Sequence, residues 1–265
     1  MSFILTDEKR RQALYTLGAT DEDMEALLAY TSNAFLPRQD TGSDELPAGW
    51  GAMWDRVQSV CSSLPRLEIF ESVAGPIPVV YPASTDDFEK LLHEIVFKGK
   101  DVPNIEKRGA QFVFGKTQRF IILTDKPYSG VPAKEMGLSE DEWLEKSMII
   151  RKNHECAHYY TKRFLGSSKN HLHDELIADF NGLYAAFGEY RSFWFMHFFG
   201  IRFDIYVEGM SDTAASVIRE LAAVAATGVE KWTKTKGFTQ LDEAGRIEYL
   251  AGKELLTYVG GGMDD

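Results

Sequence analysis

The sequence predicts an α+β fold, with a small β-sheet or hairpin region in the N-terminal half and a mostly helical C-terminal half. Two observations lead to this prediction. Short runs rich in β-branched and aromatic residues lie between residues 67 and 124 and are bounded by Gly and Pro. From residue 139 to residue 259, apolar residues recur at helical spacing. We expect the parts 1–138 and 139–259 to form one compact domain, followed by a flexible tail at 260–265.

The composition is that of a globular protein with a hydrophobic core. The 265 residues are 44% hydrophobic, which is too apolar for a disordered chain. The net charge is −11 and the basic residues form no stripe or tail, so nucleic acid and anionic membranes are not expected partners. No window reaches the roughly 18 apolar residues of a membrane span, and we do not expect the short apolar start of the sequence to act as a signal peptide. Cys61 and Cys156 are interpreted as free thiols of a reducing compartment, so we expect a cytoplasmic protein.

The N-terminal part should contain helices, then strands. Four helices are expected there, starting after Thr6, at Thr20, near Trp54 and after a capping Ser84 or Thr85. The β-like runs at 67–73 and 77–81 are separated by Gly75-Pro76, which predicts a turn between two strands. Two further runs, 110–114 and 119–124, are joined by only four residues. These runs predict a hairpin over 110–124.

The helix that opens the C-terminal part carries the most informative motif. Ser139 and Glu142 form a capping-box pattern, and the helix should continue to about Leu165. Within it, His154 and His158 belong to an HExxH motif. The two histidines lie one turn apart, about 40° from each other around the helix, so both imidazoles can reach one ion. Glu155 lies beside them and can contact a bound water without ligating the ion.

A third ligand is expected from the next helix. Glu175 and Asp179 are four residues apart and therefore on one face. If that helix runs antiparallel to the first, Glu175 can complete a site for Zn²⁺, which favours three protein ligands plus water in catalytic sites. Asp179, one turn further, can accept a hydrogen bond from the ring of His154 and orient it.

Structural interpretations compete with each of these assignments. The HExxH helix can carry two hydrogen-bonded histidines and an exposed Glu155 by chance, and Glu175 can be a solvated acidic residue in a first helical turn. His171 and His173 are alternative ligands, although a loop surface or a pocket wall suits them better.

The segments HECAH (154–158) and ELIAD (175–179) together resemble the gluzincin zinc metallopeptidases, whose pattern is HExxH followed by ExxxD. The second segment is locally similar to the third-ligand segment of the neprilysin-like peptidases. The resemblance covers about residues 145–190. It implies His154, His158 and Glu175 as zinc ligands, Glu155 as the general base and Asp179 as a residue that supports a ligand. It also implies, by analogy, that the hairpin 110–124 provides the edge strand along which an extended peptide binds.

These residues predict zinc-dependent hydrolysis of a peptide bond in a peptide or protein substrate. A donor that stabilises the oxyanion is expected from a later segment, and the candidates are His197, Arg202 and Tyr206. One alternative is a non-catalytic protein that keeps the scaffold for binding or for structural zinc. Another is a di-iron enzyme, which ranks lower because the chain has only one Glu-x-x-His. No motif specifies the cleaved sequence or an oligomeric state.

Overall fold

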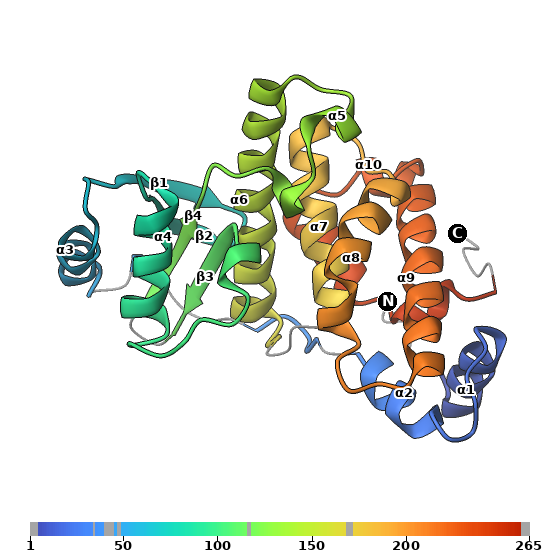
Figure 1. The fold of residues 1–265 in the computed structure, drawn as a ribbon. Helices are drawn as coiled ribbons and strands as arrows, with labels where there is room; N and C mark the ends of the chain where they lie inside the picture. The colour runs from blue at the N-terminus through green and yellow to red at the C-terminus, as the bar shows by residue number, and fades with distance from the viewer. Residues whose placement is uncertain are drawn as a thin grey trace. The chain divides into compact units, whose positions relative to one another are not determined.

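The computed structural model describes residues 5–33, 35–39, 45–46, 49–115, 118–167 and 172–260. It has the predicted α+β fold, with one four-stranded sheet in the N-terminal half and helices in the C-terminal half (Figure 1). Internal contacts divide the chain into two compact units, Asp40–Tyr160 and a second one formed by Met1–Gln39 with Thr161–Asp265. The first is called the sheet unit and the second the helical unit. This division differs from the contiguous parts 1–138 and 139–259 expected from the sequence.

The sheet unit is built around a mixed sheet with the strand order β1-β2-β4-β3. Its strands are β1 (Arg66–Ser72), β2 (Gly75–Tyr81), β3 (Ala110–Phe114) and β4 (Arg119–Leu123). The pairs β1–β2 and β3–β4 are antiparallel, whereas β2 and β4 pair in parallel. The predicted hairpin over 110–124 is therefore confirmed, and it leaves β3 at one edge of the sheet.

One turn differs from its predicted position. Gly75 and Pro76 belong to β2, and the turn lies at Val73 and Ala74, because Ser72 pairs directly with Gly75. Gly75 has a φ of 95°, a left-handed conformation that glycine adopts without strain. Gly75 is therefore the first residue of β2, and its left-handed conformation ends the two-residue turn.

One face of the sheet carries the core of the sheet unit. The helices of this unit are α3 (Trp50–Val60), α4 (Thr85–Leu91), the π-helical turn η1 (Leu92–Val96), η2 (Ile105–Lys107), η3 (Tyr128–Gly130), α5 (Ala133–Met136) and most of α6 (Glu140–Phe164). Val80, Phe120 and Ile122 of the sheet are buried against Phe88 of α4 and Val57 of α3. The helix α4 accordingly runs alongside the sheet in Figure 1.

The helical unit contains the remaining helices. They are α1 (Asp7–Thr16), α2 (Met24–Thr31), α7 (Leu172–Phe187), α8 (Ser192–Tyr206), α9 (Asp212–Trp232), α10 (Lys236–Thr239), α11 (Glu243–Ala251) and η4 (Leu255–Tyr258). Within this unit α8 packs against both α7 and α9, and α7 also contacts α11. Aromatic rings fill much of its core, where Phe180 contacts both Trp232 and Phe238.

Two other expectations concern the ends of the chain and membranes. The tail expected at 260–265 lies, beyond Gly260, outside the described residues. Among the described helices, none combines the length and the apolar character needed to cross a bilayer.

Candidate metal centre

The helix α6 begins as the sequence predicts. The backbone N–H of Ser139 donates to Glu142 at 3.0 Å, and the N–H of Glu142 donates to the Ser139 hydroxyl at 3.3 Å. This reciprocal pair is a capping box, and Glu142 also lies where the positive end of the helix dipole favours a negative charge. The cap fixes the start of the helix that presents HExxH.

The two histidines of the motif face each other on α6. The Nε2 atoms of His154 and His158 lie 3.1 Å apart, and the rings meet edge to face. Both side chains are buried, with 6% and 7% of their surface exposed. Two nitrogens bound tetrahedrally to zinc at about 2.0–2.1 Å would be separated by roughly 3.3 Å. The observed pair is therefore spaced as two ligands of one ion would be.

The other ring nitrogen of His154 has a partner that the sequence did not indicate. The hydroxyl of Tyr128, the first residue of η3, lies 3.2 Å from Nδ1 of His154. Tyr128 is itself buried. With Nδ1 bound to this hydroxyl, Nε2 is the nitrogen left to face His158 and a shared ion.

Glu155 lies between the two histidines in sequence and is half-buried. The charge of Glu155 affects the pKa values of two arginines, Arg108 and Arg151. Burial lowers the pKa of Arg108, and the charge of Glu155 opposes that decrease. Burial also lowers the pKa of Arg151 to about 10, and electrostatic interactions with Tyr128, Asp125 and Glu155 oppose the decrease. The Glu155 carboxylate therefore has cationic surroundings within the sheet unit.

The carboxylates of α7 are buried and paired with a cation. Glu175 is 5% exposed and Asp179 is fully buried. Arg202 of α8 reaches both, with Nη1 3.4 Å from Oε2 of Glu175 and Nη2 2.6 Å from Oδ2 of Asp179. One guanidinium therefore compensates two carboxylates that would otherwise be costly to bury.

Tyr206, at the end of α8, belongs to the same group. Burial raises its pKa most strongly, Arg202 lowers it, and the charges of Glu175 and Asp179, together with a hydrogen bond to Glu175, raise it further. The hydroxyl therefore stays protonated at neutral pH and remains a hydrogen-bond donor.

The structure brings the three predicted ligands together. One ligand atom from each of His154, His158 and Glu175 lies within 4.8 Å of the other two. All three side chains are buried. Two imidazoles and one carboxylate form a donor set that suits zinc at a catalytic site. The residues present therefore fit the predicted ion.

The remaining predicted residues differ in their surroundings. Among the three proposed donors, Arg202 and Tyr206 contact the predicted ligand Glu175, whereas His197 is exposed on α8. The alternative ligand His173 is buried and bonds the carbonyl of Leu250 at 2.9 Å. His171 lies outside the described residues.

The sequence reasoning missed Tyr128 and Arg151. Arg151 is buried and donates to the carbonyls of Thr124, Lys126 and Pro127, which belong to the loop that precedes Tyr128. Neither residue belongs to a sequence motif or to a periodic pattern, and Tyr128 lies 26 residues before its partner His154. The Pro and Gly residues of this segment indicate a loop but not its contacts.

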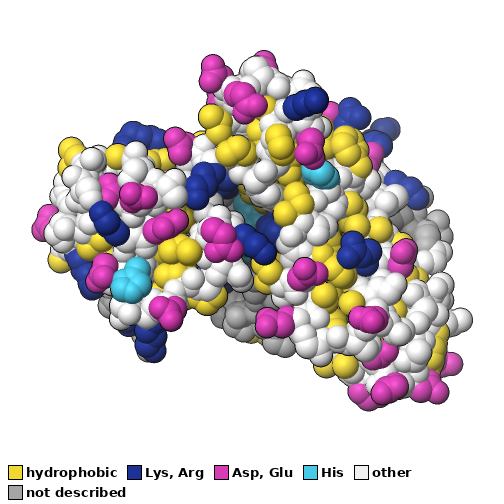
Figure 2. All heavy atoms as spheres, viewed as in Figure 1, with side chains coloured by type: hydrophobic (Ala, Val, Ile, Leu, Met, Phe, Trp, Pro, Cys, Tyr) yellow, Lys and Arg dark blue, Asp and Glu magenta, His cyan; other side chains and the backbone are white. Residues whose placement is uncertain are grey.

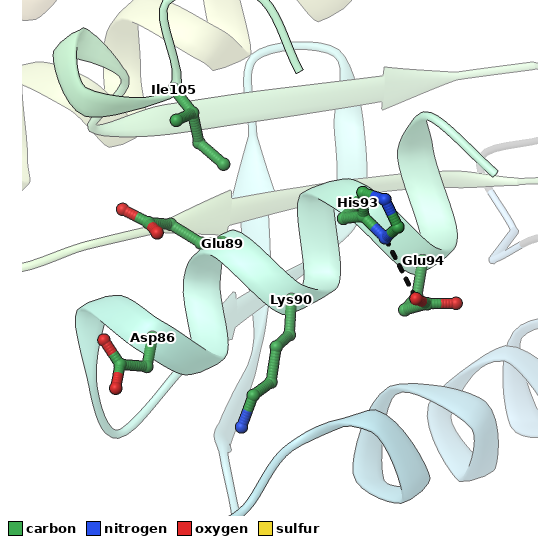
Figure 3. Close-up of a pocket in the computed structure, with 6 residues that line it drawn as sticks. All are labelled: Asp86, Glu89, Lys90, His93, Glu94 and Ile105. Atoms are coloured by element: carbon green, nitrogen blue, oxygen red, sulfur yellow. Dashed lines mark hydrogen bonds and ion pairs between the residues drawn. The ribbon is translucent and has the colours of Figure 1, made fainter. Parts of the chain in front are cut away.

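An open surface pocket in the sheet unit contains none of the predicted site residues. It has a volume of about 370 Å³ and is lined by Asp86, Glu89, Lys90, His93, Glu94 and Ile105 (Figure 3). His93 Nδ1 lies 2.9 Å from Glu94 on the same helical segment. These side chains are a solvated mixture of charges and do not converge on a common point as the HExxH residues do.

On the face shown in Figure 2, Lys and Arg side chains are interspersed with Asp and Glu side chains, so charges of both signs share this face.

Residues 116–255 match a protein family described as a family of unknown function, DUF7005. The match covers just over half of the chain. The chain belongs to this family. The DUF7005 range contains β4, α6, α7 and α8, and therefore all of the predicted ligands and donors. The comparisons with curated proteins and with solved structures gave no match.

Proposed function

We propose that this protein is a zinc-dependent metallopeptidase of the gluzincin type. The observation that carries the proposal is the buried group of His154, His158 and Glu175, whose ligand atoms lie within 4.8 Å of one another. Glu155 adds a carboxylate beside the group. A purely structural zinc site has four protein ligands and no use for such a carboxylate, whereas a catalytic site keeps one position for water.

Each residue has a defined task in this proposal. A zinc ion held by His154, His158 and Glu175 would polarise the scissile carbonyl and make a nearby water more acidic. Glu155 would accept a proton from the attacking water and later donate it to the leaving amine. Tyr206 and Arg202 are the donors available near Glu175, and one of them would stabilise the developing oxyanion. Asp179 holds Arg202 by the 2.6 Å ion pair.

The edge strand β3 supports an extended peptide as substrate. β3 has a paired side toward β4 and an outer side with no neighbouring strand in the described sheet. Phe112 and Phe114 of β3 contact the ring of Tyr159, the residue that follows His158. β3 therefore lies next to the motif helix, and a peptide could add to its outer side as another strand.

The proposal is tested by metal content and by one conservative substitution. Protein purified without added metal should contain about one zinc per chain. Glu155→Gln should keep that zinc and lose cleavage of a mixed peptide library, read by mass spectrometry, by at least about 100-fold. Glu145→Gln, an exposed glutamate of the same helix, is the matched control and should change neither.

The other outcomes are equally informative. Protein that cannot be loaded with zinc would refute the metallopeptidase. Two irons per chain would favour the di-iron alternative. If zinc binds but neither wild type nor Glu155→Gln cleaves the library while both keep the same binding partners, the non-catalytic scaffold is correct.

A further inference from the structure

We infer that Tyr128 is a positioning residue for the metal centre, which selects the nitrogen of His154 that faces the ion. The inference rests on the proposed zinc site and adds to it a residue that lies outside both sequence motifs. It concerns only the sheet unit, where every contact it uses is found.

The contact itself is specific to one ring nitrogen. The Tyr128 hydroxyl lies 3.2 Å from Nδ1 of His154, while Nε2 of His154 lies 3.1 Å from His158. A hydroxyl can accept a hydrogen bond from Nδ1–H, and that tautomer leaves the lone pair on Nε2. A partner on the second nitrogen orients a ligating histidine and increases its basicity.

Tyr128 and the loop that precedes it are fixed to the same helix, α6. The backbone N–H of Tyr128 donates to the hydroxyl of Ser147 on α6 at 2.9 Å. Arg151, one turn beyond Ser147, donates to the carbonyls of Thr124, Lys126 and Pro127. Both anchors precede His154 on one helix, so the loop and the histidine keep a constant separation.

Gly109 allows this anchoring. A Cβ atom at position 109 would lie 2.5 Å from Nε of Arg151. The carbonyl of Gly109 also accepts hydrogen bonds from the backbone N–H and the hydroxyl of Thr124, at 2.9 and 3.0 Å. The start of the loop is therefore held at Gly109 and its end at Tyr128, with the guanidinium of Arg151 packed against the backbone in between.

The burial of the contact makes it effective. Tyr128 and His154 are 5% and 6% exposed, so water has little access to replace the hydroxyl. A hydrogen-bond partner that is already oriented in such surroundings does not have to reorganise when the metal ion binds. Removing only the hydroxyl should therefore weaken metal binding while leaving the ring and its packing in place.

The test is Tyr128→Phe, measured by competition with a chelator for zinc and by the absorption spectrum of the cobalt-loaded protein. Zinc affinity should fall by about 10- to 100-fold, the usual effect of losing a partner of a ligating histidine. The ligand-field bands of cobalt should shift because the imidazole of His154 is less firmly oriented. The control is Tyr81→Phe, which removes a hydroxyl bonded to Glu68 at 2.5 Å in the same unit. It should leave zinc affinity and the cobalt spectrum unchanged.

The failure of this inference differs from the failure of the proposed function. If wild type binds zinc and Tyr128→Phe binds it equally well with the same cobalt spectrum, the positioning role is refuted and the zinc site stands. If wild type binds no zinc, the proposed function fails. A metal-free Tyr128→Phe protein that melts far below metal-free Tyr81→Phe would assign Tyr128 a structural role, and Ser147→Ala then provides the second test, because it releases the Tyr128 backbone and keeps its hydroxyl.

Discussion

The candidate centre has a histidine group, His154 and His158, and a carboxylate group, Glu175 and Asp179. These two groups are supported in different ways. In the sheet unit, His154 is contacted by the neutral hydroxyl of Tyr128, on a loop whose carbonyls accept from Arg151. In the helical unit, Glu175 and Asp179 are contacted by the charged guanidinium of Arg202. The first arrangement orients a ligand, and the second neutralises one.

This difference follows from the chemistry of the two ligand types. Burying a neutral imidazole costs little desolvation free energy. The imidazole needs only to be held in one tautomer, which a hydrogen bond to one hydroxyl can do. Two buried carboxylates need a counter-charge even without a metal. Arg202 therefore stabilises the metal-free protein, but it also shares Glu175 with any ion that binds. The comparison predicts that changes in the carboxylate group affect stability most and that changes in the histidine group affect metal affinity most.

The largest effect on stability is expected from Arg202→Met. This substitution keeps an apolar stem and removes the charge, which leaves Glu175 and Asp179 buried without their guanidinium. The free energy of unfolding of the metal-free protein should fall by about 3 kcal/mol, measured by urea denaturation at pH 7. Saturating zinc should restore part of the loss, because the ion supplies a positive charge at Glu175.

Arg202→Lys is the matched control for that experiment. It keeps the positive charge but loses the forked guanidinium that reaches two carboxylates. The decrease in the free energy of unfolding should therefore be smaller than for Arg202→Met. A loss for Arg202→Met below about 1 kcal/mol would contradict the neutralising role, since exposed ion pairs contribute that little.

A smaller effect is expected from Gly109→Ala in the support of the histidine group. The added methyl would lie 2.5 Å from Nε and 2.8 Å from Cζ of Arg151, and the guanidinium cannot move without losing its bonds to the loop carbonyls. The free energy of unfolding should fall by about 1–3 kcal/mol, and zinc affinity should fall with it.

Gly51→Ala controls for the glycine itself. Gly51 lies in α3 of the same unit, and nothing stands within 4 Å of an added Cβ atom. Alanine favours a helix over glycine, so this variant should be neutral or slightly more stable. If Gly109→Ala behaves like Gly51→Ala, the close packing of Arg151 does not constrain the loop.

The smallest effect is expected from Glu230→Gln, which acts on the helix that carries Arg202. Glu230 of α9 accepts hydrogen bonds from the backbone N–H and the hydroxyl of Ser192, the first residue of α8. The bond from Lys234, followed by those from Ser192, lowers the pKa of Glu230 from 4.5 to about 2. The free energy of unfolding of this variant should be about 1 kcal/mol lower than that of the wild type at pH 7.

The pH dependence identifies the cause. Because the folded-state pKa is depressed, the contribution of Glu230 is fully present above about pH 4.5 and is lost as the pH falls toward about 2. The difference in melting temperature between wild type and Glu230→Gln should therefore shrink over that window. Glu220→Gln, an exposed glutamate on the same helix, should show no such dependence. A constant difference between pH 2 and pH 7 would exclude the carboxylate as its source.

Much of the fold was predictable because it depends on local patterns. The hairpin over 110–124, the capping box of Ser139 and Glu142 and the helix through HExxH are confirmed, and each depends on residues close in sequence. The turn before β2 was predicted two residues too late, at Gly75-Pro76, because Gly-Pro commonly marks a turn, whereas here both residues pair with β1. The parallel pairing of β2 with β4 was not predicted, because no local pattern specifies which distant strands become neighbours.

By itself, the sequence determined the α+β class, the helix that carries His154 and His158, and the candidate third ligand Glu175. These follow from periods of a few residues, which backbone geometry converts directly into shared faces. Only the tertiary structure decided which side chains support them. Tyr128 on His154, Arg151 on the preceding loop and Arg202 on Glu175 are contacts between elements, and their partners are chosen by how buried polar groups satisfy one another once the chain has folded.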